Sequence, residues 1–131
     1  DVVTDLGAAM ADADVISCVT GATQPIVRGA LLREGTHVDL IGGFNRAMRE
    51  ADDDVVRRAS VFVDTYDDAV IAGDIAQPLE SGVLTRADLA ADLAELVAGT
   101  HPGRTRNDEI TMFKSAGTAL EDLAAARLAL G

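Results

Sequence analysis

The chain has 131 residues, with 22 acidic and 11 basic side chains, a net charge of −11 at neutral pH, and a hydrophobic content of 48%. This length and content suffice for the core of one domain, whereas so acidic a surface makes nucleic acids and anionic membranes poor partners. No apolar run approaches the roughly 18 residues of a membrane-spanning helix, and the first residues do not resemble a signal peptide, so we expect a cytoplasmic protein without a membrane partner.

Three short apolar runs predict buried β-strands. The runs "DVISCVT" (14–20), "HVDLIGG" (37–43) and "SVFVDT" (60–65) are rich in β-branched residues, are too short for helices, and end in small or polar residues. They start at equal intervals, which leaves room for the helical crossover that parallel strands require. We therefore expect an α/β fold with three adjacent parallel strands, and a short further strand around residues 110–113.

Three other segments carry helical patterns. The segment 50–59 places acids first and arginines last, as a helix dipole prefers, and residues 115–130 stack leucines and alanines on one side. The clearest helical pattern is "TRADLAADLAELVAG" (85–99), which has a threonine as N-cap and a glycine just past its end. The glycine and proline residues of segments 73–82 and 99–108 indicate loops.

Cysteine and histidine usage argues against a disulfide, a reactive thiol and a metal site. The one cysteine, Cys18, lies inside the first apolar run, so a disulfide within the chain is excluded and a buried, inert thiol is expected. The two histidines, His37 and His101, have no neighbours at the spacing of metal ligands. We therefore expect no metal site.

The carboxyl ends of the predicted strands are where a ligand is expected, because open α/β sheets bind ligands outside those ends. The three ends are residues 20–23, 42–44 and 64–65, which include glycines that permit close approach of a backbone and threonines that can bond a ribose or phosphate oxygen. The alternative is that these residues form only tight turns between strand and helix. The chain contains no G-x-G-x-x-G fingerprint for a pyrophosphate.

Four ordered blocks resemble one known family. They are "ADVISCVTGATQPIV", "HVDLIGGFNRAMREADDDVVRRASVFVDT", "AGDIAQPLESGVL" and "GRTRNDEITMFKSAGTALEDLAAA", of which the end of the last is the most specific. Together they resemble the C-terminal part of the ornithine cyclodeaminase and mu-crystallin family. The resemblance implies the second half of a Rossmann-type NAD(P)-binding domain, with a parallel sheet and flanking helices. It also implies that residues 1–131 are a fragment, in which 115–131 form a helix leading back toward a missing substrate and dimerisation domain.

The same resemblance assigns site residues one by one. It implies that NAD or NADP contacts Thr20, Ile41, Gly42, Gly43, Phe44 and Ser115. Ala116 matches a neighbouring substrate contact, and the turn 115–117 is expected to offer backbone groups near the nicotinamide. The resemblance assigns no catalytic residue in this chain, and it implies a homodimer for the full-length protein.

Two positions favour one chemistry within the family. Ornithine cyclodeaminases have an aspartate at the position of Phe44 and a lysine at that of Met48, and a phenylalanine can neither act as a base nor bond a substrate ammonium. The resemblance therefore implies an NAD(P)H-dependent reductase of a small cyclic or linear imino acid, similar to the pyrroline-2-carboxylate reductases. The alternatives are a lyase of the ornithine cyclodeaminase type and a non-catalytic ligand-binding protein like mu-crystallin.

Charged residues near these loops are expected to act structurally. Lys114, the one lysine of the chain, is expected to support the turn that follows it or to pair with an acid such as Asp122, rather than to react. Arg49 and Glu50 are expected to anchor the loop that precedes them.

Overall fold

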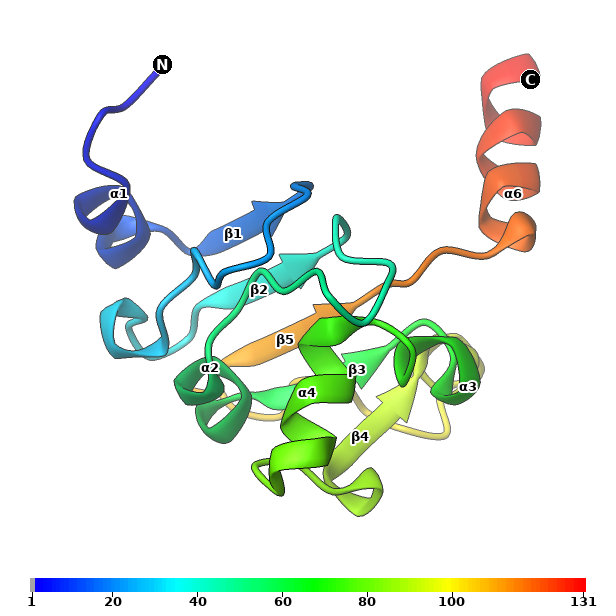
Figure 1. Ribbon diagram of the computed structural model, residues 1–131. Coiled ribbons are helices and arrows are strands. Elements are labelled where there is room, and N and C mark those ends of the chain that lie inside the picture. The colour runs from blue at the N-terminus through cyan, green and yellow to red at the C-terminus, as the bar shows by residue number, and fades with distance from the viewer. Residues whose placement is uncertain (1) are drawn as a thin grey trace.

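The computed structural model describes residues 2–131, and its centre is a sheet of five parallel strands in the order β1-β2-β5-β3-β4 (Figure 1). The strands are β1 (Val15–Cys18), β2 (His37–Leu40), β3 (Ser60–Val63), β4 (Leu89–Asp92) and β5 (Thr111–Lys114). The α-helices are α1 (Leu6–Asp12), α2 (Asp53–Arg58), α3 (Tyr66–Ala69), α4 (Gly73–Ser81), α5 (Leu93–Ala98) and α6 (Ala119–Leu130). Two 3₁₀ turns, η1 (Gly29–Leu31) and η2 (Arg86–Asp88), complete the elements. The α/β class and the parallel pairing expected from the apolar runs are confirmed.

One face of the sheet carries the core. Alternate residues of β2 and β3, among them Val38, Leu40 and Val61, are buried together with Val55 of α2 and Ile75 of α4. Figure 1 shows α2 and α4 lying across this face. Each fully buried valine or leucine contributes roughly 2 kcal/mol through the area it removes from water, so this layer supplies most of the drive to fold.

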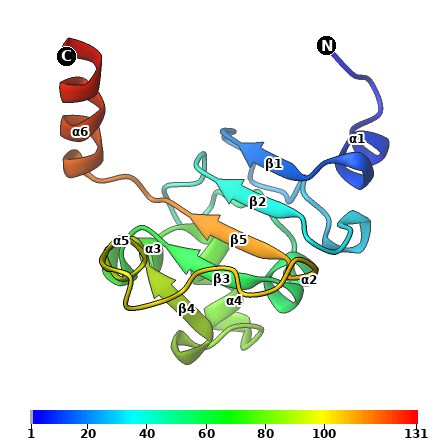
Figure 2. The same cartoon turned by 180° about the vertical axis from the view of Figure 1, so that it is seen from behind.

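The opposite face is only partly covered. Figure 2 shows β1, β2 and β5 largely open there, while α5 and residues 99–110 pass over the part nearer β3 and β4. The exposed side chain of Val15 on β1 belongs to this open face.

Cys18 lies at the end of β1 and is buried, as the sequence predicted. Burial raises the pKa of its thiol to about 11, and the nearby carboxylates of Glu50, Asp74 and Asp39 contribute to this rise. Because the thiolate is the reactive form, this cysteine is inert at neutral pH.

The expected adjacency of the three apolar strands is wrong for one pair. β5 lies between β2 and β3, so that Met112 pairs with Val38 on one side and with Val61 on the other. The chain reaches this central position by crossing back from β4 at the edge, through α5 and residues 99–110. Met112 is fully buried, and a central strand lets it pack between two β-branched neighbours.

The helix predicted over 85–99 is present only in its second half. Thr85 caps the short turn η2, the next four residues form β4, and α5 begins after the N-cap Asp92, which shares a capping box with Glu95. In β4, Leu89 and Ala91 are buried and alternate with more exposed residues, so the period of two prevails over the helical stripe. Pairing with β3 also gives these residues backbone hydrogen bonds.

The loop predicted over 73–82 is instead helix α4, with Pro78 in its interior. Burial of residues such as Ile75 and Ala76 outweighs the hydrogen bond that the proline removes. The first residue of the helix, Gly73, must be a glycine, because a Cβ there would lie 2.1 Å from the carbonyl oxygen of Met48. The helix ends at Gly82, whose φ of 76° suits a glycine.

Helix α6 stands away from the sheet and is joined to it by residues 115–118 (Figures 1 and 2). A capping box formed by Thr118 and Glu121 begins the helix, so residues 115–118 of the helix predicted over 115–131 are not helical. Its leucines, including Leu120 and Leu128, are exposed. Across residues 2–131, no helix combines the length and apolar character that crossing a membrane would need.

Candidate functional site

The carboxyl ends of four strands bring the predicted site residues to one edge of the sheet. Because β1, β2, β3 and β5 are parallel, the segments 19–23, 41–45, 64–65 and 115–118 all leave the sheet at this edge. In Figure 1 the four arrowheads point to the same side, on which α6 also departs. The residues singled out in separate parts of the sequence therefore share one edge of the sheet.

Two loops at the edge approach each other closely. A Cβ on Gly42 would lie 2.0 Å from the carbonyl oxygen of Thr20 and 2.2 Å from its nitrogen, so only glycine permits this contact. On either side of Gly42 and Gly43, Ile41 is 40% exposed and Phe44 is 62% exposed. The loop thus presents apolar side chains to solvent while its glycines face the protein.

The turn after β5 is held by the carboxylate of Asp64, a residue at one of the predicted strand ends to which the sequence assigned no role. Asp64, at the end of β3, is almost fully buried. Its Oδ2 accepts hydrogen bonds from Ser115 Oγ at 3.0 Å, from Ala116 N–H at 2.7 Å and from Gly117 N–H at 2.9 Å. Its Oδ1 accepts the N–H of Thr65 at 2.7 Å.

These bonds limit which groups of the turn 115–117 remain for a ligand. The N–H groups of Ala116 and Gly117 and the hydroxyl of Ser115 already donate to Asp64, so they are not free donors for a ligand. The turn still presents its carbonyl oxygens and the backbone of Gly117 at the edge. Gly117 has a φ of 85°, and a Cβ added there would meet open space. An acid directly after a buried strand was the signal for Asp64.

Replacing Asp64 by alanine is expected to lower the free energy of unfolding by about 2–4 kcal/mol, because three backbone N–H groups and a hydroxyl lose their acceptor. Hydrogen exchange at Ala116 and Gly117 should also become faster. Denaturant titration and amide exchange measure the two effects. Asp67→Ala, at an exposed position of α3, is the control and should change little. Unfolding free energies that agree within about 0.5 kcal/mol for both variants would contradict this role.

Lys114 has an acidic partner, but it is not the predicted Asp122. Its Nζ lies 3.7 Å from Asp74 Oδ2 on α4 and donates to the carbonyl oxygen of Leu40 at 3.1 Å. Both charged side chains are fully buried. Burial lowers the pKa of Lys114 and raises the pKa of Asp74, while their mutual attraction opposes both shifts. Lys114 therefore lies buried beneath the edge, in contact with Asp74 and Leu40 rather than exposed at the edge itself.

Glu50 anchors the loop before it, as expected, whereas the side chain of Arg49 bonds residues that follow it in the chain. The Nε of Arg49 donates to the carbonyl oxygen of Ala51 at 2.9 Å, and its guanidinium pairs with Asp53. Glu50 is fully buried, and its carboxylate accepts hydrogen bonds from both Thr20 and Gly42. The sequence did not reveal that this acid reaches a second loop, since Thr20 and Glu50 are far apart in the chain.

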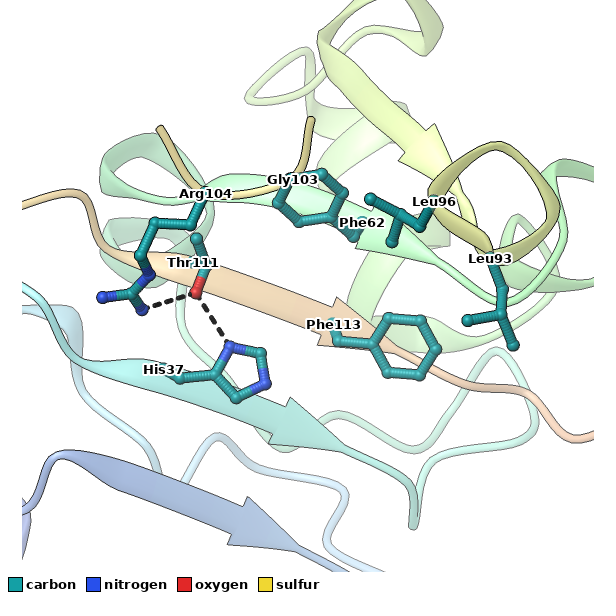
Figure 3. Close-up of a pocket in the computed structure, with 8 residues that line it drawn as sticks. All are labelled: His37, Phe62, Leu93, Leu96, Gly103, Arg104, Thr111 and Phe113. Carbon is teal, nitrogen blue, oxygen red and sulfur yellow. Dashed lines mark hydrogen bonds between the residues drawn. The ribbon is translucent and has the colours of Figure 1, made fainter. Parts of the chain in front are cut away.

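A separate cavity of about 460 Å³ lies on the partly covered face of the sheet (Figure 3). Phe62, Phe113, Leu93 and Leu96 contribute apolar surface to it. Its polar end is a hydrogen-bonded chain, in which Arg104 Nη2 donates to Thr111 Oγ1 at 2.8 Å and this hydroxyl lies 2.8 Å from His37 Nδ1. Burial lowers the pKa of His37, which keeps its ring neutral.

Comparison with known proteins adds independent information. A sequence model of the ornithine cyclodeaminase/mu-crystallin family matches residues 1–130. The Delta(1)-pyrroline-2-carboxylate reductase of Paracoccus denitrificans is 45% identical over 122 residues, which cover 92% of this chain and 39% of that protein. The structure of the Thermococcus litoralis Delta(1)-pyrroline-2-carboxylate reductase in complex with NADH and L-proline matches with a TM-score of 0.89 and 40% identity, covering 94% of this chain and 38% of that one.

A second solved structure, an archaeal alanine dehydrogenase dimer with bound NAD, matches with a TM-score of 0.82 and 33% identity over 88% of this chain and 36% of that one. The chain therefore spans less than two fifths of the length of each of these relatives.

Proposed function

Because the chain belongs to the ornithine cyclodeaminase/mu-crystallin family, we propose that it is the second half of the NAD(P)-binding domain of an imino-acid reductase. The substrate is a small cyclic or linear imino acid, and the complete protein works in the cytoplasm. The observation that carries the proposal is the match, through nearly the whole chain, to a pyrroline-2-carboxylate reductase whose structure holds NADH and L-proline.

The carboxyl edge has the properties that a dinucleotide requires. A Cβ on Gly21 or Gly117 would meet open space, so both leave bare backbone that a flat ring can approach. Within residues 2–131, the N–H group of Phe44 donates to no backbone or side-chain acceptor, and this residue is exposed at the edge. NADH or NADPH at this edge supplies the hydride, while the protein binds and orients the reactants.

Individual roles follow from this placement. Thr20, the loop 41–44 and Ser115 are proposed to contact the cofactor, and Ala116 to contact the substrate. Since the N–H of Ala116 and the hydroxyl of Ser115 are held by Asp64, these two residues contribute carbonyl oxygens and a small surface rather than hydrogen-bond donors.

Position 44 supports the reductase over the lyase. The side chain of Phe44 is exposed at the proposed cofactor edge and has no group that can take a proton or bond an ammonium. A reductase does not need such a group there, because the reacting hydride belongs to the cofactor.

We propose in addition that the complete protein is a homodimer, and that residues 115–131 lead from this domain toward its substrate and dimerisation domain. Two observations support this. The leucines of α6 are exposed along a helix that stands apart from the sheet, and the matching alanine dehydrogenase is a dimer.

The test is steady-state oxidation of NADH and NADPH by the complete protein that carries these 131 residues, with pyrroline-2-carboxylate as substrate. We expect turnover with the cyclic imine, and no deaminating cyclisation of ornithine with NAD⁺. Ornithine turnover without imine reduction would replace the reductase by the lyase. Tight ligand binding without either reaction would favour a non-catalytic binding protein.

A further inference from the structure

Three charged side chains are fully buried directly beneath the proposed cofactor edge. They are Glu50, which precedes α2, Asp74 on α4 and Lys114 at the end of β5. Charged groups are rarely buried unless they are paired and hydrogen-bonded, because removing them from water costs several kcal/mol. Their presence at this place calls for a role that an apolar residue could not fill.

Glu50 joins the two loops that follow β1 and β2. Its Oε1 accepts the backbone N–H of Thr20 at 2.7 Å and the hydroxyl of Thr20 at 2.8 Å. Its Oε2 accepts the N–H of Gly42 at 3.0 Å. One carboxylate thus uses both oxygens to fix the separation of the two loops.

The other two charges fix Glu50 in turn. Asp74 Oδ1 accepts the N–H of Glu50 at 2.8 Å and the N–H of Ala51 at 3.0 Å. Lys114 balances the negative charge of Asp74 from 3.7 Å and bonds the carbonyl oxygen of Leu40, the last residue of β2. The second glycine of the loop lies directly over this pair, since a Cβ on Gly43 would be 2.8 Å from Asp74 Oδ2.

The hydroxyl of Thr20 has its hydrogen-bonding direction set by Glu50. Its one proton is donated to Oε1, and one lone pair accepts the N–H of Ala22 at 3.2 Å. A hydroxyl has two acceptor positions, so only one acceptor position remains for a ligand. Thr20 can therefore receive a hydrogen bond from a ligand but cannot donate one.

We propose that Glu50 is a positioning residue for the cofactor: it sets the distance between Thr20 and the 41–44 loop and makes the Thr20 hydroxyl an acceptor for a donor group of the dinucleotide. Such donors are a ribose hydroxyl and the carboxamide NH₂. Glu50 itself does not touch the cofactor. This inference rests on the proposed placement of NAD(P)H at the carboxyl edge.

The test measures the dissociation constant of NADH by calorimetry in the complete protein, for the wild type and for Glu50→Gln, Thr20→Val, Thr20→Ser and the double variant Glu50→Gln/Thr20→Val. A glutamine amide keeps the size of the side chain but has only one oxygen, so it cannot accept from both loops as the carboxylate does. We expect Glu50→Gln and Thr20→Val each to weaken NADH about tenfold, the size of one lost hydrogen bond. Thr20→Ser should stay within about twofold of the wild type.

The double variant separates positioning from a general loss of stability. If Glu50 acts through Thr20, Glu50→Gln in the Thr20→Val background should weaken NADH by less than about threefold. Glu34→Gln removes an exposed charge as a control and should leave the affinity unchanged.

Wild-type affinity in folded Glu50→Gln would overturn the positioning role and leave the proposed function intact. If Glu50→Gln does not fold, wild-type affinity in Thr20→Val would overturn it in the same way. Absence of NADH binding in the wild type would instead reject the proposed function, and the inference with it.

Discussion

Gly42→Ala is expected to lower the free energy of unfolding by about 3 kcal/mol or more and to abolish tight NADH binding. The new Cβ would lie 2.0 and 2.2 Å from backbone atoms of Thr20 and 2.5 Å from Glu50 Oε1. Backbone atoms of a neighbouring loop cannot give way as a flexible side chain does, so the two loops must separate. Denaturant titration and NADH calorimetry measure the two effects.

Gly21→Ala is the matched control, because its Cβ would meet open space on the loop that follows β1. We expect its unfolding free energy to remain within about 0.5 kcal/mol of the wild type. Equal stability of Gly42→Ala and Gly21→Ala would show that the loops after β1 and β2 do not touch as described.

Lys114→Met is expected to lower the free energy of unfolding by about 3–5 kcal/mol, since it leaves the fully buried carboxylate of Asp74 without its cation. Methionine has a similar length and keeps the apolar contacts of the side chain. The double variant Lys114→Met/Asp74→Asn should recover part of the loss, because no uncompensated charge then remains in the pair. Chemical denaturation of the two single variants and the double variant gives the coupling directly.

Arg106→Met is the control for this substitution. Arg106 also pairs with an acid, Asp108 at 3.1 Å, but both side chains are largely exposed, so little change is expected. A small effect at Lys114, similar to that at Arg106, would contradict a buried ion pair. Strictly additive losses in the double variant would mean that Lys114 and Asp74 do not interact.

Much of the fold was predictable because local patterns and tertiary structure agree. The runs 14–20, 37–43 and 60–65 are β-branched and apolar, and they form parallel strands whose carboxyl ends meet at one edge. The charge order of segment 50–59 agrees with α2, and the leucines and alanines of segment 115–130 agree with α6, which begins at Ala119. Where local and global preferences coincide in this way, sequence reasoning succeeds.

The errors occur where tertiary contacts override local patterns. Nothing near Met112 tells a central strand from an edge strand, because strand order depends on how β4 and residues 99–110 cross the sheet. Leu89 fits a helical stripe equally well, and only its pairing beside β3 decides for a strand. Pro78 marked a loop, although burial of its neighbours stabilises a helix.

The candidate site shows the same division. The position of the site could be predicted from the carboxyl ends of the strands. The carboxylates that anchor its loops could not be predicted from the sequence. Glu50 bonds Thr20, and Asp64 bonds Gly117, across long stretches of sequence. An acid's partner at such a separation depends on the tertiary arrangement, which local sequence patterns do not define.

A crystal structure of the complete protein with NADH would show where the cofactor binds. We expect the nicotinamide end of the cofactor at the carboxyl edge, against Thr20 and residues 41–44, with a donor group of the cofactor bonded to the Thr20 hydroxyl. We also expect Glu50 to keep both loops joined beneath the ring, without touching it. NADH bound in the cavity between Phe62 and Phe113, or elsewhere away from this edge, would rule out the proposed cofactor site.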